Sequence, residues 1–165
     1  MAKKNLWLEI LAMVLVFGMM VVSCDNDPEG DTWSNVTSLS QLNGTWKGSY
    51  SYSETEDGIT VRTTMEITQT FNASAKTVSG SYKMTMAFSG AGIAEMWPFI
   101  KETMGGEGFT VNDSNHSLSM TGTINESLDD NDIAGMLNNP NLQINQNGTK
   151  IKSSDEGMEI IMTKQ

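Results

Sequence analysis

Apolar and polar residues alternate along most of the chain after Leu42, a pattern typical of β-strands with one buried face. The stretches between them are rich in asparagine, aspartate and glycine, and Asn147-Gly148 is a dipeptide that favours tight hairpins. We expect strands near residues 44–52, 59–71, 78–88, 109–111, 118–124 and 158–162, with two more on either side of Asn147-Gly148.

One apolar face can be traced from strand to strand, because every second residue points to the same side of a sheet. On the three longest strands this face carries aromatic residues, methionines and branched aliphatic residues, opposed mainly by threonine, serine and charged residues. The residues expected on it are Trp46, Gly48, Tyr50, Tyr52, Ile59, Val61, Met65, Ile67, Phe71, Val78, Tyr82, Met84, Met86, Phe88, Leu118, Met120, Ile124, Leu142, Ile144, Ile151, Met158, Ile160 and Met162.

Two segments depart from the alternation and have helical spacing. In 92–104 the apolar residues recur every three or four positions, and Pro98 places the expected helix start near Trp97, with the proline in the first turn. A second short helix is expected after a cap at Asp129 or Asp130 and before Asn138. About eight strands with two helical insertions predict an all-β domain, an antiparallel up-and-down meander that closes into a barrel and so removes its edges.

The first two dozen residues have the composition of a signal peptide. Lys3 and Lys4 precede thirteen apolar or small residues, 10–22, which are fewer than the roughly 20 that a spanning helix needs. The run ends in Val21-Val22-Ser23-Cys24, which resembles the lipobox of bacterial lipoproteins. The resemblance implies that Cys24 is lipidated and becomes the first residue of the mature protein. The alternative is an uncleaved anchor from Leu6, with Cys24 an ordinary buried thiol.

Three regions follow from this reading. Residues 1–23 are the expected signal peptide, 24–40 an acidic flexible tether, and 41–165 a single β-barrel domain. Within the tether only Trp33 is expected to contact the domain or the membrane interface. The expected location is extracytoplasmic, on the periplasmic face or the cell surface, with the membrane contacted through the N-terminal lipid.

Charge narrows the choice of partners. Loss of Lys3, Lys4 and Glu9 with the signal peptide leaves 8 basic and 19 acidic residues. A surface of this sign repels nucleic acid and anionic bilayers, so nucleic acid is excluded as a partner and attachment depends on acyl chains. With one cysteine, no disulfide forms within the chain.

Asn43-Gly44-Thr45-Trp46, placed before a meander of strands, resembles the Gly-x-Trp signature of the calycins, the group of lipocalins, fatty-acid-binding proteins and avidins. The resemblance implies that the tryptophan packs across the closed end of a barrel, beneath a basic residue from the last strand. Lys164 is the candidate for that basic residue, in place of the usual arginine. The combination of lipobox, acidic tether and small barrel also resembles small lipoproteins of spirochaetes, a likeness that implies no activity.

No catalytic, metal or cofactor site is expected. His116 is the only histidine and lies in a polar turn, and Asp129-Asp130-Asn131-Asp132 lacks the glycine and the distal glutamate of a calcium loop. The sequence therefore favours a protein that is not an enzyme.

Methionine is the unusual residue type, because nine of the thirteen methionines lie after Cys24 and most of these fall on the expected inward face. Flexible, polarisable methionines fill core gaps and also adapt to varied apolar ligands. Two functions remain open: a barrel that binds a small apolar ligand, and a surface interaction protein with a filled core. The expected lining of the barrel interior is Trp46, Tyr50, Met65, Tyr82, Met84, Met86, Met120, Met158 and Met162.

Overall fold

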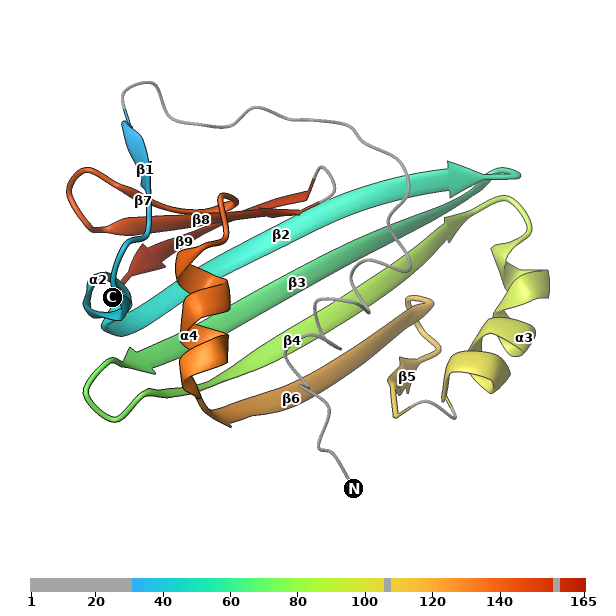
Figure 1. Ribbon diagram of the computed structural model, residues 1–165. Helices are drawn as coiled ribbons and strands as arrows, with labels where there is room; N and C mark the ends of the chain where they lie inside the picture. The colour runs from blue at the N-terminus through green and yellow to red at the C-terminus, as the bar shows by residue number, and fades with distance from the viewer. Residues whose placement is uncertain (1–30, 106–107, 156–157) are drawn as a thin grey trace.

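The computed structural model describes residues 31–165 except 106–107 and 156–157 (Figure 1). Nine strands in these residues form one antiparallel sheet, in the order β1-β7-β8-β9-β2-β3-β4-β6-β5. The strands are β1 (Trp33–Asn35), β2 (Gly44–Glu56), β3 (Ile59–Asn72), β4 (Thr77–Gly90), β5 (Thr110–Asn112), β6 (Ser117–Ser127), β7 (Leu142–Asn145), β8 (Lys150–Asp155) and β9 (Met158–Lys164).

The predicted antiparallel, mainly β architecture is confirmed, but the described sheet is not closed. The meander β2-β3-β4-β6 and the meander β7-β8-β9 join where β9 pairs with β2. Closure would require the edge strand β5, beside β6, to pair with the edge strand β1, beside β7, and these two strands are not paired. The chain passes from β6 to β7 through helix α4 (Asp130–Leu137).

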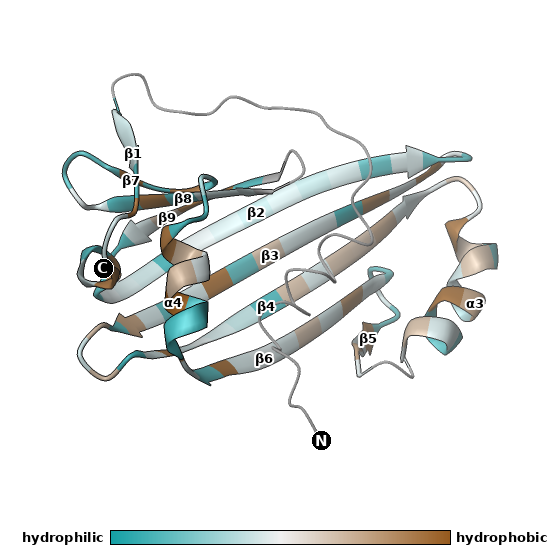
Figure 2. Ribbon diagram, in the orientation of Figure 1, coloured by the Kyte–Doolittle hydropathy of each residue, from teal (hydrophilic) through white to brown (hydrophobic). Residues whose placement is uncertain are grey.

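The register confirms that the predicted apolar residues share one face. Across β2, β3, β4 and β6 many opposed pairs belong to this set, as in Gly48 opposite Ile67 and Ile67 opposite Tyr82, whereas Trp46 and Tyr52 stand opposite the buried polar residues Gln69 and Thr63. The other face carries mainly hydroxyl and charged side chains, and some hydroxyls pair directly, as Thr45 and Thr70 do at 2.8 Å. Figure 2 shows the resulting mixture of hydrophilic and hydrophobic positions along each strand.

Helix α4 forms as its sequence predicts. The Asp129 carboxylate accepts hydrogen bonds from the backbone N–H groups of Asn131 and Asp132, both at 2.8 Å, and Asp132 accepts one from the Asp129 N–H at 2.9 Å. This reciprocal cap satisfies donors that the first turn leaves free. Met136 and Leu137 turn toward the sheet and pack against its apolar face.

Helix α3 (Ile93–Gly105) begins earlier than predicted, because tertiary packing overrides the proline. Pro98 lies inside the helix and not in its first turn. The turn before it is fixed by Ile93 and Trp97, which are 9% and 5% exposed and pack into one core cluster. Burial of these two apolar side chains offsets the hydrogen bond that Pro98 cannot donate.

The prediction that residues 24–40 form a flexible tether is wrong for residues 33–40, which pack on the sheet. β1 pairs with β7, placing Trp33 opposite Asn145, and Val36 is 1% exposed in the core. Helix α2 (Leu39–Leu42) follows directly and contributes the fully buried Leu42. Val36 and Leu42 are isolated apolar residues in a polar segment, so no periodic pattern marks them. Both are nevertheless buried at this end of the sheet.

Polar contacts also hold this N-terminal segment to the sheet. Lys150 Nζ lies 2.6 Å from Asp31 Oδ2, and Lys152 Nζ lies 4.6 Å from the centre of the Trp33 ring. The hydrogen bond from Lys150, with a second from Asn145, lowers the pKa of the Asp31 carboxyl. Residues 1–30, which contain the expected signal peptide, Cys24 and the first part of the expected tether, lie outside the described residues.

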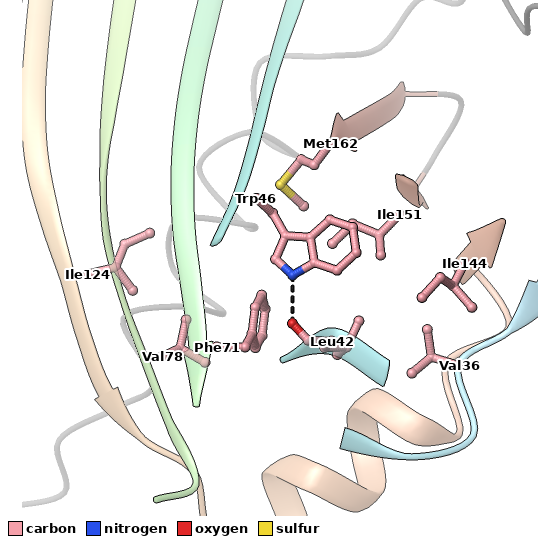
Figure 3. Close-up of a cluster of buried hydrophobic side chains, with 9 residues drawn as sticks. All are labelled: Val36, Leu42, Trp46, Phe71, Val78, Ile124, Ile144, Ile151 and Met162. Carbon is pink, nitrogen blue, oxygen red and sulfur yellow. Dashed lines mark hydrogen bonds between the residues drawn. The ribbon is translucent and has the colours of Figure 1, made fainter. Parts of the chain in front are cut away.

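The apolar face carries two separate clusters of buried side chains. The Trp46 cluster lies at the end of the sheet that α4 and α2 cover, and it consists of Val36, Leu42, Trp46, Phe71, Val78, Ile124, Ile144, Ile151 and Met162 (Figure 3). The Trp97 cluster joins α3 to the opposite end of the strands and consists of Phe88, Ile93, Trp97 and Leu118. Among the described residues no helix is long and apolar enough to cross a membrane.

A chain that begins at Gln41 should be less stable than one that begins at Asp31 by more than about 2 kcal/mol, the scale of a large core truncation. The reason is the loss of Val36 and of the β1 ladder from the Trp46 cluster. Urea denaturation of the two chains measures the difference. Equal midpoints would mean that residues 31–40 add nothing to the core.

Candidate functional site

The candidate site is the middle of the apolar face, between the two clusters. Tyr50 on β2 stands opposite Met65 on β3, Met65 opposite Met84 on β4, and Met84 opposite Met120 on β6. We call these four residues the central row. They belong to neither cluster, and in Figure 1 the described helices α4 and α3 lie toward opposite ends of the strands that carry the row.

Burial in the central row is graded. Met65 is 8% exposed, and Tyr50, Met84 and Met120 are partly buried. Directly opposed side chains on neighbouring antiparallel strands are about 5 Å apart at their Cβ atoms, so each member of the row is within reach of the next. The row is therefore a continuous band of aromatic and thioether groups.

The tyrosines at one end of the row form a pair. The Tyr50 and Tyr52 ring centres are 5.7 Å apart with the planes tilted by 38°. Burial raises the pKa of the Tyr50 hydroxyl, and Tyr52 contributes to the same shift. A higher pKa keeps the hydroxyl neutral well above neutral pH, so the row presents one polar group without charge.

The rows on either side of the central row also carry tyrosine, methionine and aliphatic side chains. On the side of the Trp46 cluster, Tyr82 lies over Gly122, where any added side-chain carbon would overlap the tyrosine ring. A glycine at this position lets the ring lie flat on the sheet. On the other side, Met86 and Leu118 are opposed and pack in or against the Trp97 cluster.

The end of the face beneath α2 is closed by Trp46, as Figure 3 shows. Its indole is fully buried, and its Nε1 donates a hydrogen bond of 2.6 Å to the backbone oxygen of Leu42. Lys164 is opposite Trp46 in the sheet, and its Nζ lies 5.1 Å from the ring centre. A Cβ atom at Gly44 would stand 2.8 Å from Lys164 Cε, so glycine leaves the lysine room to reach the indole.

Eight of the nine predicted lining residues divide into three groups. Tyr50, Met65, Met84 and Met120 form the central row, whereas Trp46, Met162 and Tyr82 belong to or pack against the Trp46 cluster. Met86 packs against the Trp97 cluster. The backbone of Met158 pairs with Asp155, and its side chain lies outside the described residues.

The sequence did not predict the polar residues Lys101, Asp113 and His116 that surround Trp97. Trp97 Nε1 donates a hydrogen bond of 2.7 Å to Asp113, which also lies 2.9 Å from Lys101 Nζ and whose pKa these two donors lower. His116 was expected to be a solvated turn residue, yet it is half-buried with its ring 5.2 Å from that of Trp97. Its turn position carries no sequence signal for this packing.

Two surface hollows are lined by residues that do not belong to the central row, although Tyr82 and Gly122 of the neighbouring row line the first one. One, of about 550 Å³, is lined by hydroxyl and charged residues such as Glu66, Thr68 and Lys83. The other, of about 480 Å³, lies where α3 begins and is lined by four carboxylates together with Ile59, Val61, Ala91, Gly92 and Met96. The described residues contain no group of three or more histidine, cysteine, aspartate or glutamate side chains that could hold a metal ion.

Comparison of the chain with models of protein families, with curated proteins and with solved structures found no match.

Replacing Trp46 with alanine should cost about 3–5 kcal/mol of folding stability, the range for a fully buried aromatic residue. Lys164→Met should cost no more than about 1 kcal/mol, because it removes a cation–π contact from an exposed side chain. Thermal or urea unfolding measures both changes. Equal losses from the two variants would show that Trp46 does not organise this end of the sheet.

Proposed function

We propose that this chain is a lipid-anchored extracytoplasmic lipoprotein whose calycin-like β-domain binds a small apolar molecule at the central row. One observation carries the proposal: aromatic and thioether side chains meet in register on the inward face, between two core clusters and part of neither. The proposal involves no catalytic step and no cofactor.

The central row suits a ligand of adaptable shape. Its methionines have flexible, polarisable side chains that fit varied apolar partners, and its tyrosine is neutral. Four strands spaced about 4.8 Å apart make the row roughly 14 Å wide, enough for a short acyl chain or a small ring system. The row contains no charged side chain, so an organic ligand with a buried carboxylate or ammonium group would lack an ionic partner.

The surroundings of Trp46 support the calycin-like reading. The tryptophan closes one end of the apolar face, and a basic residue of the last strand covers its ring. Gly44 leaves space for that basic side chain, which gives the Gly-x-Trp sequence a physical reason. The chain runs from β6 to β7 through α4, and the edge strands β5 and β1 are not paired with each other, so the proposal is for an open relative of the calycin barrel.

Anchoring at Cys24 is proposed from the lipobox alone. Cys24→Ser should release the protein from membranes into the soluble fraction, because serine does not accept the thioether-linked lipid. Fractionation and mass spectrometry of the native protein check this. An unmodified Cys24, or a serine variant that remains membrane-bound, would refute the anchor without touching the ligand proposal.

Surface interaction remains a second candidate, favoured by the end of the molecule at α3. Met96 and Phe99 are the large apolar residues exposed in the described part of the chain, at 44% and 65%. Met96 also lines the hollow that contains Glu54, Glu56 and Glu95. A partner with basic and apolar side chains would complement this end.

Binding of the neutral probe N-phenylnaphthylamine to the mature protein, residues 24–165, separates the two candidates. We expect one saturable site whose affinity falls at least about tenfold in Met120→Lys, because a lysine in the central row blocks the ligand or is buried unpaired. Thr121→Lys is the matched control, since the next residue of β6 points to the other face and is exposed.

Both variants must first show cooperative unfolding, so that a loss of binding is not a loss of fold. If the wild-type protein does not bind the probe, or if Met120→Lys and Thr121→Lys bind it equally, the ligand proposal fails. The surface-interaction candidate then takes its place.

A further inference from the structure

Three methionines of the central row come from three adjacent strands at the same level of the sheet. Met65 opposes Met84, and Met84 opposes Met120. Met86 follows two residues after Met84 on β4 and so points to the same face. This part of the face therefore presents several thioether sulfurs side by side.

Apolar packing alone does not require methionine at these positions. The Trp46 cluster fills a comparable part of the same face with nine buried residues, of which Met162 is the one methionine. In the central row, methionine occupies three of four positions. Leucine or isoleucine would supply the same burial with better-defined rotamers, so the concentration of sulfur points to chemistry that aliphatic residues lack.

The geometry lets the three sulfurs converge. Neighbouring strands are about 4.8 Å apart, so Met65 and Met120 start roughly 10 Å from each other with Met84 between them. An unbranched side chain with three rotatable bonds can move its sulfur several ångströms toward the central residue. Convergence on one point above Met84 therefore needs rotamer changes and no movement of the backbone.

We propose that Met65, Met84 and Met120 form a binding site for a soft monovalent metal ion, Cu(I), with the three thioether sulfurs as ligands. Thioethers select Cu(I), whereas Zn²⁺, Ca²⁺ and Mg²⁺ take histidine, thiolate or oxygen ligands. The central row contains none of those ligands apart from the neutral Tyr50 hydroxyl. This inference uses the same face as the proposed apolar ligand but is tested separately from it.

The surroundings stabilise a single positive charge. The Tyr50 and Tyr52 rings stand at one end of the row, and aromatic faces attract cations. The acidic balance of the whole chain, net −10, raises the local concentration of cations around the protein. Three neutral ligands leave the ion monovalent, which makes its burial less costly than that of a divalent ion.

The test uses the mature protein with its methionine methyl groups labelled with ¹³C. Ag(I), a soft monovalent ion that is stable in air, is titrated first, and Cu(I) is then supplied under ascorbate in competition with bicinchoninate. We expect one equivalent of either ion to shift the methyl signals of Met65, Met84 and Met120. Met84→Leu should weaken binding at least about tenfold, because it removes one ligand while it keeps an apolar side chain of similar volume.

Met136→Leu is the matched control, because Met136 packs against the Trp46 cluster from α4 and is not part of the row. It should bind Ag(I) as the wild type does. Ag(I) shifts spread over all the methionines, or equal affinity in Met84→Leu and the wild type, would overturn the metal site. Binding of N-phenylnaphthylamine to Met84→Leu reports on the apolar-ligand proposal independently, since leucine leaves the row apolar.

Discussion

An antiparallel sheet with one apolar face must cover that face, and here the central strands are longer than their covers. β3 and β4 each extend over 14 residues, and the described helices pack near their two ends. Each end consequently has its own buried cluster, and the central row lies between them. The position of the candidate site follows from this mismatch in length, because Tyr50, Met84 and Met120 are only partly buried and belong to neither core cluster.

The Trp46 end shows how few residues set the arrangement. The Trp46 indole donates a hydrogen bond to Leu42, lies beneath the Lys164 ammonium group and packs against residues of β3 and β9. These contacts connect β2, the first long strand, to β9, the last strand. Val36 reaches the same cluster from the N-terminal segment. A chain attached to a membrane through Cys24 would thus enter the domain at its closed end, with α3 at the opposite end of the sheet (Figure 1).

Sequence patterns predicted the parts of the fold that depend on local physics. The alternation of apolar and polar residues assigned the apolar side chains of β2, β3, β4 and β6 to the correct face of the sheet. The cap at Asp129 and the turn at Asn147-Gly148 also formed as expected. Long-range packing decided the rest: Val36 and Leu39 entered the core from a polar segment, and Trp97 kept a helical turn ahead of Pro98. The interior methionines could be listed from parity, but their division between two clusters and one row depends on the positions of α3 and α4, which no local pattern encodes.

On our proposal, the middle of the apolar face binds ligands and does not serve only as core. The most direct measurement is a ¹³C-methyl methionine spectrum of the mature protein during titration with a neutral apolar ligand such as decanol. We expect saturable shifts at Met65, Met84 and Met120, with Met96 on α3 and Met136 on α4 unchanged. Shifts confined to Met96, or no shift at any methionine at saturating ligand, would contradict it and would place the function of this protein on its outer surface.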